Sequence, residues 1–81
     1  MSEQDFRTQA REMVHRARAF TLSAMPPDLP DKAETPGQVA LEAKHGTPKA
    51  FAEACAQAVG EISINNAVAA VERYADEWRA A

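Results

Sequence analysis

The sequence predicts an all-α protein, a small bundle of three to four helices whose long first and last helices pack antiparallel. In two long segments, apolar residues recur at the alternating four- and three-residue spacing of one helix face. Two shorter segments between them each begin with Thr-Pro, a helix-start signal. The chain has 81 residues, enough for one domain, so residues 1–81 are expected to form a single helical domain.

The composition indicates a globular protein with a thin core. The chain is 46% hydrophobic and 26% charged, which excludes a disordered tail. Much of the apolar content is alanine, which favours helix but buries little surface, so we expect close helix packing rather than a large ligand cavity. A chain of this length buries only about 60% of its unfolded surface, and self-association is a natural supplement.

A first helix is expected over residues 3–24. Ser2 can cap its start, and Met25-Pro26-Pro27 ends it. The apolar stripe expected to face the core consists of Phe6, Ala10, Met13, Ala17, Phe20 and Ala24. A flanking basic face consists of Arg7, Arg11 and Arg18. This face is a candidate binding surface for an acidic partner protein, and its alternative interpretation is a solvated face paired with nearby carboxylates.

A proline-rich linker and a short helix follow. Residues 26–34 contain three prolines and alternating charges, which disfavour helix and sheet. Thr35-Pro36-Gly37-Gln38 then has the order of an N-cap, a first-turn proline and a capping-box glutamine. It predicts a helix over 36–45, ended by Gly46.

A third helix is expected over residues 48–59, after the N-cap signal Thr47-Pro48. If it continued unbroken into the last helix, the apolar stripes of the two segments would lie roughly 200° apart around one axis. Either the helix breaks near residues 60–63, or one long kinked helix buries opposite faces along its length. We favour the break, with Gly60 as the C-cap and Ser63 as the next N-cap.

The last helix, over residues 64–80, has the clearest pattern in the chain. Its apolar residues fall within an arc of roughly 160°, and this helix carries the only Trp and the only Tyr. We expect the arc to form much of the core and to contribute to a homodimer interface. The residues of this dimer or core face are Ile64, Val68, Val71, Tyr74 and Trp78.

Charge and cysteine content exclude several classes of partner. A net charge of −3 gives no general attraction to nucleic acid or to anionic membranes. The longest wholly apolar run, residues 67–71, is far too short to span a bilayer, and the N-terminus lacks a signal-peptide pattern. A single cysteine excludes an internal disulfide, so a cytoplasmic location is expected.

Two Glu-x-x-His pairs raise the alternative of a metal-binding helical bundle. Glu12/His15 and Glu42/His45 have the spacing that di-iron bundles use, and further carboxylates are available at Glu53, Glu61 and Glu72. The first pair projects roughly opposite the apolar stripe of its helix, whereas bundle ligands point inward. We therefore expect no metal and no cofactor.

A second alternative is a helix-turn-helix-like DNA-binding regulator. An alanine-rich helix, a glycine turn and a second helix occur in that order over residues 48–80. The second helix, however, exposes three carboxylates, and only Asn65 and Asn66 suit contacts with bases. Nucleic acid is therefore not the expected partner.

Signatures of catalysis are absent from the sequence. Nucleophilic catalysis needs a positioned base beside Ser or Cys, and Cys55 lies on an apolar stripe, where it is expected to be a buried hydrophobe. No phosphate-binding glycine loop or zinc spacing occurs. By elimination, we expect a small non-catalytic cytoplasmic protein that binds another protein as a regulator, inhibitor or accessory subunit. Chains of this kind occur among bacterial and phage proteins, and we expect a homodimer.

Overall fold

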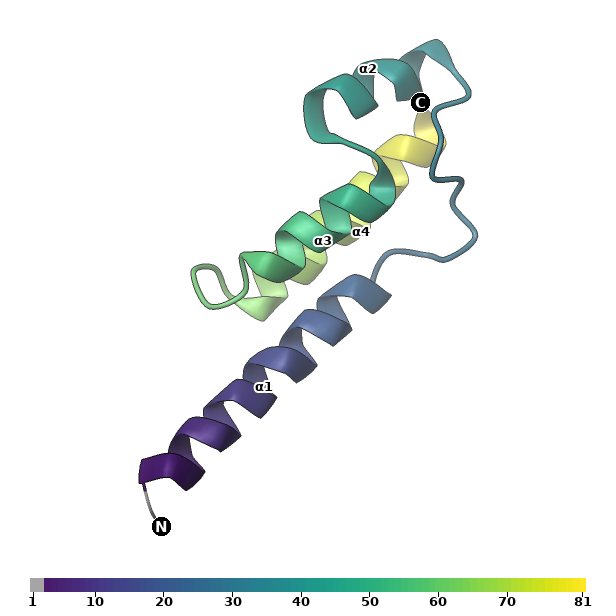
Figure 1. The fold of residues 1–81 in the computed structure, drawn as a ribbon. Helices are drawn as coiled ribbons and strands as arrows, with labels where there is room; N and C mark the ends of the chain where they lie inside the picture. Colours follow the sequence, from purple (N-terminus) through teal and green to yellow (C-terminus); the bar gives the residue numbers. More distant parts are fainter. Residues whose placement is uncertain (1–2) are drawn as a thin grey trace.

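The structure of the protein is a computed structural model that describes residues 3–81, so the expected cap Ser2 lies outside the described residues. Within this range the chain forms four helices and no extended strand: α1 (Glu3–Ser23), α2 (Pro36–His45), α3 (Pro48–Gln57) and α4 (Ile64–Ala80) (Figure 1). The predicted class, a small all-α bundle with long first and last helices, is confirmed.

A hydroxyl side chain caps the start of each of the last three helices. The oxygen of each capping residue accepts a hydrogen bond of 3.0 to 3.2 Å from the backbone N–H three residues further on. The caps are Thr35, Thr47 and Ser63. At the other end of α2, Gly46 has a φ of 91°, which only glycine adopts readily, and its N–H donates to the Glu42 carbonyl over 2.8 Å.

The chain breaks between α3 and α4, which are two helices and not one long kinked helix. The expected C-cap at Gly60 is corrected: α3 ends two residues earlier than predicted, at Gln57, and Ala58 is its C-cap. Gly60 lies in the intervening turn with a φ of 110°, and a single β-bridge joins Val59 to Ile62. The turn reverses the chain, so α3 and α4 form an antiparallel hairpin. Phe51 near the start of α3 stacks on Tyr74 near the end of α4, with ring centroids 4.3 Å apart.

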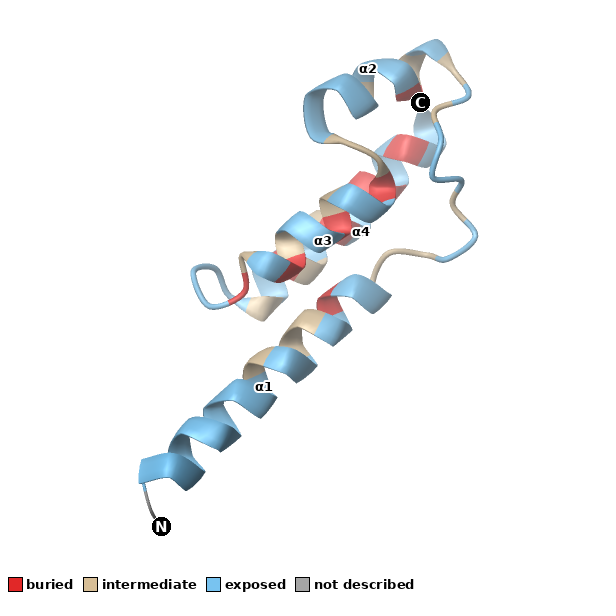
Figure 2. Cartoon of the chain, in the orientation of Figure 1, coloured by how far each residue is buried: buried red, intermediate tan, exposed pale blue. Residues whose placement is uncertain are grey.

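The core lies along the α3–α4 hairpin (Figure 2). The apolar arc of α4 faces inward: Val71 and Trp78 have no exposed surface and Tyr74 has 2%. Opposite them, α3 contributes mainly alanines, Ala52 and Ala56, each 2% exposed. Because the buried side chains of α3 are small, the two helix backbones approach closely.

Hydrogen bonds, more than apolar burial, hold α2 against the end of α4. The Gln38 side-chain amide donates to the Trp78 carbonyl over 3.1 Å, and its oxygen accepts from the Glu34 N–H over 2.8 Å. The Thr35 hydroxyl donates to the Ala81 carbonyl over 2.9 Å. Gly37 allows this approach, since a Cβ added there would lie 3.0 Å from the Ala81 Cβ.

The buried face of α1 differs from the expected apolar stripe. Thr21 is fully buried, and Val14, Ala17 and Arg18 are half-buried beside it. Thr21 fits an apolar contact because its hydroxyl donates to the Ala17 carbonyl of the same helix over 2.8 Å. The large residues of the expected stripe, in contrast, are exposed. The close-packed, alanine-lined α3–α4 hairpin accepts the small residues of α1 and leaves the phenylalanines outside.

The direction of α1 also differs from the expectation. In Figure 1, α1 and α4 run in the same direction, and α3 runs opposite to both. The expected antiparallel pairing of the first and last helices is therefore corrected: the antiparallel neighbour of α1 is α3. The reason is the path of the chain. After α1, the linker and α2 lead to the far end of the hairpin, where α3 begins, so α3 runs back along α1. The α4 helix then reverses again and runs in the same direction as α1.

The molecule is elongated. Its principal extents are 55 × 21 × 17 Å and its radius of gyration is 15.1 Å, whereas a compact domain of this length has about 12 Å. The elongation comes from α1, whose second half packs on the hairpin while its first half projects beyond it (Figures 1 and 2). Every residue from Glu3 to Met13 is exposed.

Candidate protein-binding surface

Three large apolar side chains form a line along the exposed side of α1. Phe6, Met13 and Phe20 are 68%, 69% and 60% exposed. A spacing of seven residues falls only about 20° short of two full helical turns, so the three lie within roughly 40° of one another. We call these three residues the apolar ridge. The largest apolar patch on the surface of a protein is often a functional one, so the ridge is a candidate surface for binding.

The projecting half of α1 has no cover of its own. An isolated helix shorter than about 12 residues is marginal in water, and most helices in proteins depend on the packing of an apolar face. Residues 3–13 carry two members of the ridge, Phe6 and Met13, and neither is buried. A partner that covered them would stabilise both the helix and the ridge.

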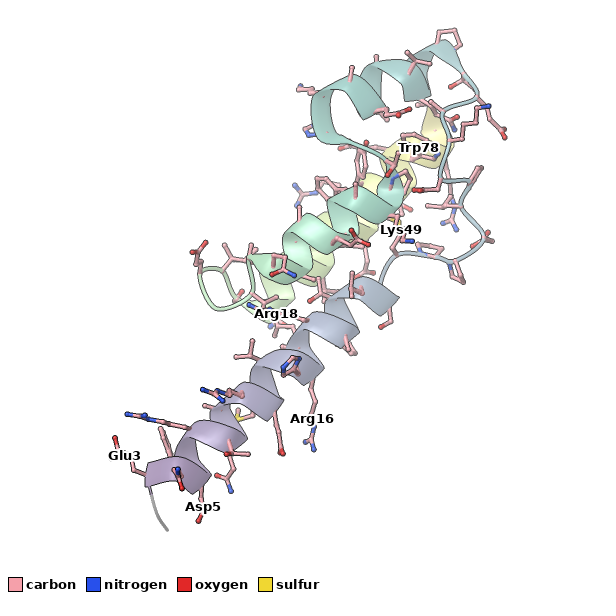
Figure 3. The ribbon with its side chains drawn as sticks, viewed as in Figure 1. Glu3, Asp5, Arg16, Arg18, Lys49 and Trp78 are labelled. Atoms are coloured by element: carbon pink, nitrogen blue, oxygen red, sulfur yellow. The ribbon has the colours of Figure 1, made fainter. Side chains whose placement is uncertain are left out.

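The basic residues of α1 do not form one continuous exposed surface. Arg7 and Arg11 are exposed on the projecting half, and Arg7 forms a 3.0 Å ion pair with Glu3 one turn before it. Arg18 is half-buried in the second half of α1, on the side that faces the α3–α4 turn (Figure 3). Its Nε is buried with no hydrogen-bond partner among residues 3–81. Arg7 and Arg11 are thus available to a partner, and Arg18 is less so.

A shallow hollow lies between these arginines on the flank of α1. Its volume is about 240 Å³, and it is lined by Ala10, Arg11, Val14, His15 and Arg18. A larger hollow, of about 390 Å³, lies where the end of α1 meets the proline-rich segment and the start of α3. Its apolar lining includes Leu22, Met25, Leu29 and Pro48. Asp31 closes one side by accepting a 3.2 Å hydrogen bond from the Lys49 N–H.

The residues expected to form a dimer or core face on α4 lie inside the molecule. Val71, Tyr74 and Trp78 are buried, and Ile64 and Val68 are half-buried. The Tyr74 hydroxyl donates to the Gly46 carbonyl over 2.6 Å, and burial raises the pKa of this side chain. This face is therefore occupied by the chain itself and offers little surface to a second molecule.

The two Glu-x-x-His pairs lie on different helices. Within residues 3–81, no three His, Cys, Asp or Glu side chains are close enough together to hold a metal ion. Glu12 and His15 are exposed on α1. The His45 ring packs edge-on against Phe51 and Tyr74, with ring centroids 6.0 and 5.6 Å away. This packing gives His45 a structural role at the end of α2.

The remaining candidate residues show no feature that would make them reactive. Cys55 is half-buried on α3, and burial raises the pKa of its thiol, which lowers the fraction of reactive thiolate. Asn65 and Asn66 are exposed in the first turn of α4. Further along the same helix Glu72, Asp76 and Glu77 are also exposed, and they would repel a phosphate backbone.

Comparisons with known proteins provide no functional information. No family model, no curated protein and no solved structure matches this chain. None of the helices described here combines the length and the apolar character needed to cross a bilayer.

The sequence pattern identified the residues of the ridge but assigned them to the core. Periodicity shows that Phe6, Met13 and Phe20 share a face, and it does not show which neighbour covers that face. One signal pointed the other way: the α3 and α4 segments are rich in alanine, and such helices pack too closely to accept two phenylalanines from a third.

Proposed function

We propose that this protein is a small non-catalytic protein-binding module, acting as a regulator, inhibitor or accessory subunit, and that the projecting half of α1 is its binding surface. The observation that supports the proposal is the apolar ridge, three large side chains at least 60% exposed on a helix whose first half has no cover of its own. The single free cysteine suits a reducing compartment, and we place the protein in the cytoplasm.

The ridge has the form of a helix that binds in a groove. Peptide helices bound in this way present apolar anchors on one face at spacings of three, four or seven residues, and the partner supplies an apolar groove. Phe and Met are suitable anchors because they bury much surface, and Met adapts to irregular pockets. Arg7 and Arg11 are exposed on the same half of α1, roughly 100° to 160° around the helix from the ridge, so they would contact only the rim of a groove that wraps around the helix.

Site-specific photocrosslinking tests this function in living cells. A photoreactive amino acid is placed at Gln9, beside the ridge, and in a matched control at Glu72, on the exposed face of α4. We expect covalent adducts from position 9 that are absent from position 72 and are lost when Met13→Glu is added. A lack of adducts at position 9, or adducts unaffected by Met13→Glu, would contradict the proposed function. The masses of the adducts identify the partner.

A further inference from the structure

Large and small residues alternate along the side of α1 that carries the apolar ridge. The members of the ridge are separated by alanines at a four- and three-residue spacing, which is the pattern of a helix-packing seam. The alanines of this seam are Ala10, which is exposed, and Ala17 and Ala24, which are half-buried at its border with the rest of the chain. A groove suited to this face must therefore offer large side chains opposite alanines and small ones opposite the ridge.

The α1 helix itself meets this requirement when a second copy lies antiparallel to it. In that orientation each large residue of one copy lies opposite an alanine of the other, and the pairs are Phe6 with Ala24, Ala10 with Phe20 and Met13 with Ala17. In a parallel pair, Phe6 would meet Phe6 and Ala10 would meet Ala10, so overfilled layers would alternate with empty ones. We propose that a second copy of this chain covers the apolar ridge, with the two α1 helices antiparallel.

Charge does not oppose a contact between two copies. Residues 3–23 carry four arginines against three carboxylates, and the projecting half alone, residues 3–13, carries two arginines against three carboxylates. Two such helices therefore bring little net charge together when they pair.

The amount of exposed apolar surface suits a small interface. A Phe or Met of which about two thirds is exposed can bury on the order of 100 to 150 Å², or roughly 400 Å² per copy for the ridge. Stable interfaces bury about 800 Å² per partner, so the remainder must come from the alanines, the stems of the arginines and the contact with the other hairpin.

Cysteine cross-linking tests both the occupant and its orientation. Gln9→Cys and Ser23→Cys are made separately, each with Cys55→Ser; both positions are exposed and lie on one flank of the seam. In the antiparallel pair, residue 9 of one copy lies beside residue 23 of the other, within reach of a disulfide. We expect the mixture of the two variants to yield at least about fivefold more disulfide-linked dimer than either variant alone.

The inference rests on the proposed function, because it names the partner of the same surface, and the two can fail separately. If either variant alone forms as much disulfide-linked dimer as the mixture does, the antiparallel pairing is wrong. If the mixture of the two variants forms no disulfide-linked dimer and light scattering finds only monomer, no second copy binds. In that case, covalent adducts between position 9 and other proteins in the photocrosslinking experiment would still support the proposed function. An adduct of twice the mass of the chain, lost with Met13→Glu, supports both.

Discussion

Tyr74 joins the end of α2 to α3 and α4 through a single side chain. Its hydroxyl donates to the Gly46 carbonyl over 2.6 Å and lies 3.2 Å from the Leu41 carbonyl, which fixes the end of α2. Its ring stacks on Phe51 of α3 and contacts Trp78 one turn further along α4, with a centroid separation of 6.1 Å. The end of α2 is therefore fixed by one polar group in an otherwise apolar cluster, whereas its start is held by Gln38 and Thr35.

Removal of the Tyr74 hydroxyl should destabilise the fold without changing the ring packing. Tyr74→Phe leaves the Gly46 carbonyl without its side-chain donor, and we expect a loss of about 1 to 2 kcal/mol in the free energy of unfolding. Urea denaturation measures this value. Arg73→Ala, at the exposed neighbouring position, is the control and should cost little. Equal effects of the two substitutions would show that the hydroxyl has no such role.

Stability should fall at alkaline pH because of the same side chain. Burial, with additional contributions from Glu77 and Glu42, raises the pKa of Tyr74 above its ordinary value near 10. The folded state holds this proton more tightly than the unfolded state. The resulting stability is fully present below about pH 10 and is lost as the pH rises through the folded pKa.

Unfolding free energies at about pH 8 and about pH 11 check this dependence. We expect the protein with Tyr74→Phe to lose less stability between these two pH values than the protein that keeps Tyr74. Both proteins should carry Cys55→Ala, because burial also raises the pKa of that thiol and its titration would overlap. The same decrease in both proteins would exclude Tyr74 as the cause.

At the scale of the elements, the sequence predicted the boundaries of the helices well because the signals are local. Thr35, Thr47 and Ser63 cap helices through hydrogen bonds to residues three positions away, and such contacts are visible in a short window of sequence. Gly46 ends α2 as expected, whereas Gly60 has a positive φ within the turn and the C-cap of α3 is Ala58.

Which face each helix buries was harder to predict, because that choice depends on the neighbour. Phe20 and Thr21 are adjacent in α1, and propensity favours burial of the phenylalanine, yet Thr21 is fully buried and Phe20 is 60% exposed. The alanine-rich hairpin leaves room for the smaller side chain only. On α4 the inward face matched the pattern, because the whole arc is wide enough to meet both α1 and α3.

Hydrogen exchange should distinguish the two halves of α1. In dilute solution the amides of the projecting half, residues 5–13, should exchange much faster than those of the core segment, residues 67–78, because no other element covers them. We expect protection of residues 5–13 to increase with protein concentration as a second copy covers the ridge. In Met13→Glu this concentration dependence should disappear. Strong protection of residues 5–13 at high dilution would contradict the conclusion that no other element of the chain covers this half of α1.

Arg16 gives a test of the arrangement within the paired helices. It is exposed, points away from the hairpin (Figure 3), and in the antiparallel pair lies near Arg16 of the other copy on the solvent side. Since like charges repel, Arg16→Gln should tighten self-association by roughly twofold to fivefold. Arg7→Gln is the matched control, because Arg7 forms an ion pair with Glu3 of its own helix, and this substitution should change self-association little. Sedimentation equilibrium measures both, and an equal effect of the two variants would contradict this arrangement.

At the scale of the whole molecule, the elongated shape explains why a helical bundle of this size would need a partner. The α3–α4 hairpin, the α2 cap and the second half of α1 bury a small core in which Trp78, Tyr74 and Val71 are the largest side chains. The first half of α1 extends the longest dimension to 55 Å and adds nothing to that core. The sequence indicated self-association from the size of the chain alone and placed the contact on the apolar face of α4, which lies inside the molecule; the contact that we propose lies on α1.

The most direct test of the account is light scattering coupled to size-exclusion chromatography, from low micromolar concentration up to about 1 mM, since a small interface calls for a wide range. We expect the mass of the unsubstituted protein to rise from one chain to two, and Met13→Glu, with unchanged helix content in circular dichroism, to remain at one chain throughout. Val39→Glu, an exposed apolar residue on α2, is the control and should associate normally. A monomer over the whole range, or a dimer that survives Met13→Glu, would contradict the claim that a second copy covers the apolar ridge.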